Sequence, residues 1–173
     1  MRVAFERTGE RSYATVVMLA GEPPRRTDPA PGYDDEIPHD LVHYLVEAEL
    51  GLSHGVYGRA AAGGGAFVST SSAGSARQHA RARRRQKKRE AALSREDEGD
   101  MARSEYIVGL CDLAWRRRAG AETPTWAEGA QLPPEESQVI ARVLALLDEV
   151  APRWKKLPIG EALVFRWPNV RLR

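Results

Sequence analysis

The stretch VAFERTGERSYATVV, residues 3–17, decides the fold class of this chain. Its two ends are rich in Val, Phe, Tyr and Thr, which favour strands, and the second run continues to residue 19. The residues between them, TGER at 8–11, are typical of a turn. We therefore expect an N-terminal β-hairpin with strands near residues 3–5 and 13–19.

Three amphipathic segments follow the hairpin, and each predicts a helix. The first covers residues 38–50, where Pro38 suits the first turn and Gly51 suits the C-terminal stop. The second carries Met101, Val108, Cys111 and Trp115 on one helical stripe. The third opens at residues 133–136, is expected to end or kink at Pro152, and has an inner face of Val139, Ile140, Val143, Leu144, Leu147 and Val150. A short helix near residues 56–62 is also expected.

The β-branched and aromatic residues at 162–167 predict a last strand, which Pro168 stops. With the hairpin it would form a small antiparallel sheet packed against about three helices. A hydrophobic fraction of 42% in 173 residues is enough for one core of that size. We expect an α+β fold in a single domain spanning residues 1–173.

The first eleven residues interleave charged and apolar side chains and contain no apolar h-region. No run approaches the roughly 20 apolar residues of a membrane span. We therefore expect a cytoplasmic protein without membrane contact, and its wealth of Arg, Ala and Gly is typical of GC-rich bacteria. Cys111 is the single cysteine, which excludes an internal disulfide, and its apolar neighbours predict a buried thiol.

Residues 63–99 differ in composition from the rest of the chain. The Gly/Ser/Ala-rich part, 63–75, predicts a mobile linker. Residues 76–92 contain strong helix formers but almost no apolar face, so they predict a solvated helix or a disordered arm. We interpret 63–99 as a flexible linker and basic arm inserted between helices.

Eight cations crowd into this arm although the net charge of the chain is only +2. They could contact several phosphates, but no aromatic residue interleaves them, so any nucleic-acid binding would be non-specific. The acidic residues at 96–100 could neutralise them instead, and a solvated linker is the favoured interpretation. The cations are Arg77, Arg81, Arg83, Arg84, Arg85, Lys87, Lys88 and Arg89.

The helix at 38–50 carries the one pattern that indicates chemistry. His39 and His43 are four residues apart, and Glu47 follows after four more, so the three share one stripe. Two imidazoles and a carboxylate suit zinc, iron or manganese. Asp40 lies about 100° away, which suits an orienting acceptor or a general base, and His54 is a possible extra ligand.

This pattern leads to two competing hypotheses. One is a small metal-binding protein that holds its ion with the histidine stripe, with metal-dependent hydrolysis as its candidate reaction. The other treats the histidines as structural and the protein as a metal-free interaction module that uses the basic arm on nucleic acid or an acidic partner.

A helical wheel separates the two glutamates at the end of this helix. Glu49 falls inside the apolar arc, about 40° from Leu45 and about 60° from Val46, whereas Glu47 falls on the polar side. A carboxylate that faces a core needs a buried partner, either an arginine or a metal. We therefore expect Glu49 to be the buried, paired carboxylate.

Three segments carry resemblances to known families. PHDLVHYLVEAELGL (38–52), VAFERTGERSYATVV (3–17) and LPIGEALVFRWP (157–168) together resemble a family of small uncharacterised proteins from actinobacteria and similar bacteria. More distantly, the run HDLVH at 39–43 is similar to the HDxxH zinc motif of the ubiquinone-biosynthesis zinc proteins. In that motif a glutamate follows after eleven intervening residues, and Gly55 holds this position here. The resemblance therefore implies a zinc site in which Glu47 or Glu49 replaces the glutamate of the motif.

Overall fold

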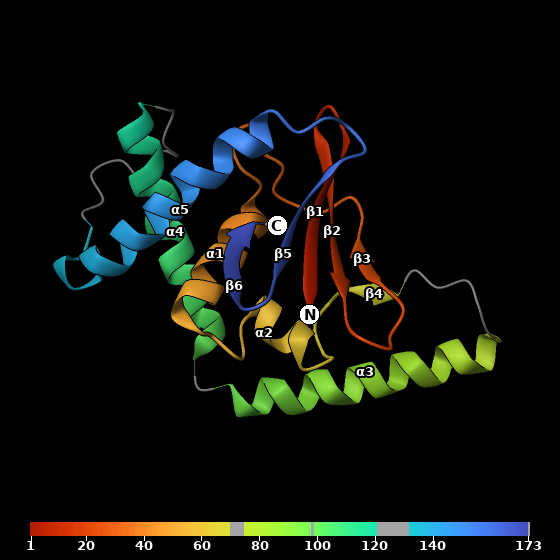
Figure 1. The fold of residues 1–173 in the computed structure, drawn as a ribbon. Coiled ribbons are helices and arrows are strands. Elements are labelled where there is room, and N and C mark those ends of the chain that lie inside the picture. The colour runs from red at the N-terminus through yellow and green to blue at the C-terminus, as the bar shows by residue number, and fades with distance from the viewer. Residues whose placement is uncertain (70–74, 98, 121–131, 173) are drawn as a thin grey trace.

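A computed structural model describes residues 1–69, 75–97, 99–120 and 132–172. Its centre is a six-stranded sheet in the order β4-β3-β2-β1-β5-β6, and every neighbouring pair is antiparallel (Figure 1). The strands are β1 (Arg2–Gly9), β2 (Ser12–Met18), β3 (Arg25–Thr27), β4 (Val68–Ser69), β5 (Ala162–Arg166) and β6 (Asn169–Leu172).

The expected hairpin forms the centre of this sheet. Val3 pairs with Val17 across β1 and β2, and on the other side of β1 it pairs with Phe165 of β5. The N-terminal hairpin and the C-terminal strand are therefore neighbours, as predicted, and the α+β fold class is confirmed. The sheet is larger than expected, because β3, β4 and β6 extend both of its edges.

The helices are α1 (His39–Leu50), α2 (Val56–Ala61), α3 (Ala76–Glu96), α4 (Asp100–Ala119) and α5 (Ser137–Lys155), with a 3-10 turn, η2 (Pro134–Glu136), before α5. Helices α1, α4 and α5 pack together beside the sheet (Figure 1). Their fully buried side chains include Leu41, Leu45, Ile107 and Leu147, which form one core with Phe5 of β1. Pro152 lies inside α5, which continues for one more turn to Lys155 instead of ending there.

The segment expected to be a mobile linker is partly packed against the body. Gly63 and Gly64 are buried, and Phe67 is 4% exposed. The side chain of Gln86 on α3 donates hydrogen bonds to the carbonyl oxygens of Gly65 and Phe67. Residues 70–74 of the expected linker lie outside the described part of the chain.

Cys111 is buried in the core, as its apolar neighbours predict, and burial raises the pKa of its thiol to about 12. Within the described ranges, no helix combines the length and the apolar character needed to cross a membrane.

Candidate functional site

Helix α1 begins and ends where its sequence predicts. Pro38 is its N-cap residue, and Gly51 closes it in the left-handed conformation at φ +68°, which a glycine adopts without strain. These limits place His39 in the first turn, exposed to solvent, and His43 one turn later, where it is 5% exposed. The stripe that carries both histidines faces α4.

The two histidines and a carboxylate from α4 form a compact cluster. The Nε2 atoms of His39 and His43 are 3.1 Å apart, and the rings meet edge to face. Nε2 of His43 also lies 3.5 Å from Oε2 of Glu105. One ligand-type atom from each residue lies within 4.8 Å of the other two, so the three could hold one ion.

The second nitrogen of the His43 ring is fixed by a buried chain of hydrogen bonds. Nδ1 of His43 is 3.0 Å from Oγ of Ser104, and that hydroxyl donates to Oε1 of Glu47 at 2.9 Å. A serine hydroxyl has one proton, so when it donates to Glu47 its oxygen accepts from Nδ1–H of His43. This leaves Nε2 of neutral His43 without a proton and with its lone pair toward His39 and Glu105.

Burial, together with the neighbouring charge of His39, lowers the pKa of His43 to about 4. The imidazole is therefore neutral at physiological pH, which is the form that binds metals.

Glu47 does not lie beside the two Nε2 atoms. Its side chain is fully buried, and its two oxygens accept hydrogen bonds of 2.8 Å from the backbone N–H groups of Val56 and Tyr57. Those groups open α2, so Glu47 caps the N-terminus of that helix. The carboxylate that the structure brings to the two histidines is Glu105.

The expected burial of Glu47 and Glu49 is reversed. Glu49 is not buried: its side chain is 23% exposed, and it accepts a 2.6 Å hydrogen bond from Arg142, whose side chain is 52% exposed. Glu47 is the buried carboxylate, because α4 and the start of α2 cover the side of α1 that the wheel marks as polar. The wheel describes one helix and contains no information about neighbours on that side.

Asp40 ties α1 to the sheet. Its carboxylate accepts a 2.9 Å hydrogen bond from Oγ1 of Thr15 on β2, and its carbonyl oxygen accepts one from the Tyr57 hydroxyl. Burial raises the pKa of Asp40, although the hydrogen bond from Thr15 and the charge of His39 oppose this shift. These contacts give Asp40 an anchoring role between α1 and β2.

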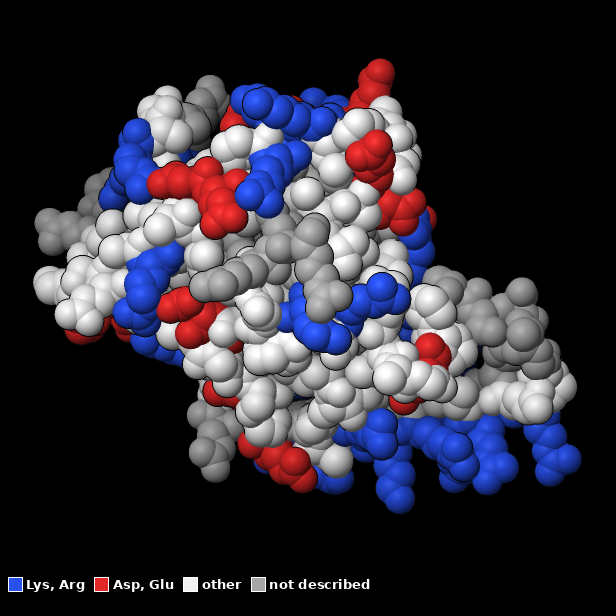
Figure 2. Space-filling view, viewed as in Figure 1, with Lys and Arg blue, Asp and Glu red and all other residues white. Residues whose placement is uncertain are grey.

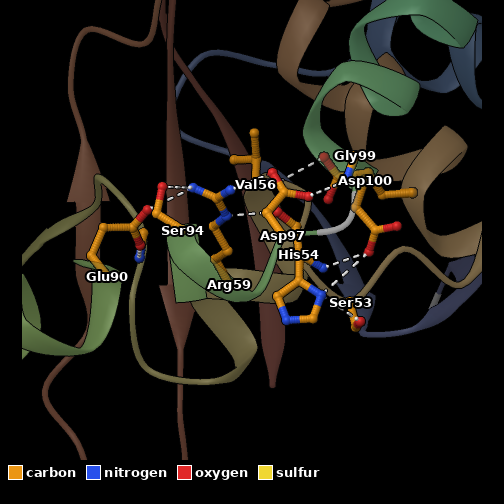
Figure 3. A network of polar contacts seen from close by, with 11 residues as sticks. Ser53, His54, Val56, Arg59, Glu90, Ser94, Asp97, Gly99 and Asp100 are labelled. Carbon is orange, nitrogen blue, oxygen red and sulfur yellow. Dashed lines mark hydrogen bonds and ion pairs between the residues drawn. The ribbon is translucent and has the colours of Figure 1, made fainter. Parts of the chain in front are cut away.

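His54 belongs to a separate network (Figure 3). Its backbone N–H donates to Asp100 at 2.9 Å, and its ring Nδ1 lies 3.1 Å from the Ser53 hydroxyl. Next to it, buried Arg59 donates to the carbonyl oxygen of His54 and to the carboxylates of Glu90 and Asp97. This network joins α2 to α3 and to the start of α4.

Sequence reasoning missed Ser104 and Glu105, which contact His43 across 61 and 62 positions of the chain. One signal was present. Ser104 lies one turn before Val108 on the apolar stripe of α4, and a polar residue at a core position needs a partner. Glu105 had no such signal, because an exposed glutamate on a helix is common.

Comparisons of the chain with protein-family models, with curated protein sequences and with solved structures find no match.

Proposed function

We propose that this protein binds a divalent transition-metal ion, zinc foremost, through Nε2 of His39, Nε2 of His43 and the carboxylate of Glu105. The observation that carries the proposal is the pair of Nε2 atoms facing each other at 3.1 Å, with Glu105 at 3.5 Å from the buried one. The chain from His43 through Ser104 to Glu47 is the kind of support that orients a metal-binding histidine.

The spacing of the three groups suits a small ion. Bonds of about 2.0–2.1 Å to a tetrahedral zinc ion place neighbouring ligand atoms about 3.3 Å apart. The two distances to Nε2 of His43, 3.1 and 3.5 Å, lie on either side of that value.

A metal-free interpretation explains only part of the geometry. An N–H of His39 donating to Nε2 of His43 would account for the 3.1 Å distance. It would leave the Glu105 oxygen facing the lone pair of the same nitrogen, and two acceptors repel unless a cation lies between them. Moving the single proton of His43 to Nε2 would remove that repulsion, but Nδ1 would then face the oxygen of Ser104, whose hydroxyl donates to Glu47. Protonating both ring nitrogens would charge a buried imidazole, which burial disfavours.

Three protein ligands leave part of the coordination sphere open, as in catalytic zinc sites. His39 and Glu105 are exposed, so the open side faces solvent. An ion held in this way supplies Lewis-acid chemistry at its free position, and hydrolysis is the reaction class we propose. Two imidazoles with one carboxylate also suit iron and manganese, so the test includes both.

The proposal is tested by calorimetric titration of untagged, metal-stripped protein with zinc, manganese and, anaerobically, ferrous iron. We expect one zinc ion per chain, and a loss of at least about tenfold in affinity for His39→Ala and Glu105→Gln. Glu49→Gln is the matched control, because it makes the same chemical change on α1 away from the cluster, and it should bind zinc like the parent. Unchanged affinity in Glu105→Gln and His39→Ala, or binding far below one ion per chain for all three metals, would contradict the proposal.

A further inference from the structure

Helix α3 presents a continuous basic face to solvent. Arg77, Arg81 and Arg84 are spaced by four and three residues, and Lys88 and Arg95 continue the row, so the five lie within about 60° of one another around the helix axis. All five side chains are exposed. From Arg77 to Arg95 the row is about 27 Å long. Figure 2 shows the Lys and Arg side chains along the edge of the molecule that α3 forms in Figure 1.

The opposite face of α3 holds the helix to the body. Gln86 and Glu90 are half-buried. Gln86 donates hydrogen bonds to the carbonyl oxygens of Gly65 and Phe67, and Glu90 accepts one from the backbone N–H of Gly65. Further along, Ser94 and Asp97 contact Arg59. These contacts begin at the middle of α3, and its N-terminal half extends past the sheet (Figure 1). Ser75 and Gln78 form a capping box that starts this extended half.

Three of the acids that could neutralise the basic row are paired elsewhere. Glu90 and Asp97 pair with Arg59, which is buried, and Asp100 pairs with His54 (Figure 3). Among residues 1–69, 75–97, 99–120 and 132–172, no ion pair joins an acid to any cation of the row. The row is therefore free to contact an external anion.

The cations of the row also repel one another, and a bound polyanion would offset this repulsion. Arg77 and Arg81 are like charges four residues apart, as are Arg84 and Lys88. Each such pair destabilises a helix by about 0.2–0.5 kcal/mol. An anion with regularly spaced charges along the row would offset these repulsions by placing a negative charge beside each cation.

We infer that α3 binds the phosphate backbone of duplex DNA without reading its sequence. Residues 75–97 contain no Phe, Tyr or Trp, so they offer no platform for stacking the bases of a single strand. The outer face has no large apolar residue, which a membrane-surface helix requires. A helix about 10–12 Å across fits the B-form major groove of about 12 Å, whereas the major groove of duplex RNA is too narrow.

The test is fluorescence anisotropy with a labelled DNA duplex of two helical turns, at salt concentrations between about 50 and 200 mM. If the five cations contact five phosphates, the logarithm of the binding constant should fall against the logarithm of salt with a slope of about −4.5. A variant with all five changed to glutamine, a good helix former, should lose binding and keep its circular dichroism.

The control variant changes five exposed cations outside α3 to glutamine and so has the same net charge. It should bind DNA like the parent; its positions are Arg2, Arg11, Arg153, Lys156 and Arg166. Equal losses in both variants, or equal affinity of the parent and the α3 variant, would overturn the inference. Tighter binding to duplex RNA or to anionic vesicles than to DNA would also overturn it. Zinc binding uses other residues, so either proposal can fail alone.

Discussion

Glu47 buries its carboxylate completely, yet both of its oxygens accept hydrogen bonds. Oε1 accepts from Val56 N–H and from the Ser104 hydroxyl, and Oε2 accepts from Tyr57 N–H. Gly55 lies so close that a Cβ added there would come within 2.4 Å of the Glu47 carboxyl carbon. A single side chain thus joins α1, α2 and α4, and it also fixes the hydrogen bond that orients His43.

We expect Glu47→Ala to lower the free energy of unfolding by about 3 kcal/mol, because it leaves the part-buried N–H of Val56, the buried N–H of Tyr57 and the buried Ser104 hydroxyl without their acceptor. Glu49→Ala should cost less than about 1 kcal/mol, because its partner Arg142 is more than half exposed. Denaturant unfolding midpoints of the two variants measure the difference. Equal losses, or the larger loss in Glu49→Ala, would show that the assignment of the buried carboxylate is incorrect.

At the scale of elements, α3 is attached by a set of polar contacts, and its half-buried Leu93 lies against Gly64. Arg59 donates three side-chain hydrogen bonds to Glu90, Ser94 and Asp97, and Gln86 adds two to the backbone of residues 65–67. Arg59 is 7% exposed, and these partners stabilise its buried positive charge. Removing these contacts should therefore detach α3 from the body without unfolding the core of α1, α4 and α5.

Replacing Arg59 with Met keeps an unbranched side chain and removes the guanidinium. We expect amide hydrogen exchange to speed up across residues 86–97, while α1 and α5 keep their protection, because the core does not depend on this contact. Arg142→Met is the control, since it removes an exposed guanidinium far from α3. Unchanged exchange in residues 86–97 of the Arg59 variant would mean that α3 is held by other contacts.

The elements that the sequence predicts correctly are those with local signals. The hairpin, the limits of α1 at Pro38 and Gly51, and the apolar stripe of α4 depend on residues within one or two turns of each other. The short strands β3 and β4 carry no such signal, since each is too short for an alternating pattern. The docking of α3 was missed because it depends on Arg59, which is remote in sequence.

At the scale of the whole molecule, the candidate metal site is a product of the contact between α1 and α4. The histidine pair was visible from its spacing on one helix, but the third member of the cluster and the supporting serine come from a helix about 60 residues later. Only the tertiary structure shows that Glu105, and not Glu47, completes the cluster. The basic row of α3 lies on another element and uses none of these residues.

The most direct test is a crystal structure of the zinc-reconstituted protein with anomalous diffraction data collected at the zinc edge. We predict one strong anomalous peak between α1 and α4, about 2.0–2.2 Å from Nε2 of His39, Nε2 of His43 and an oxygen of Glu105. A peak bound by Glu47 or at His54 and Asp100, or no peak between α1 and α4, would contradict the proposed site.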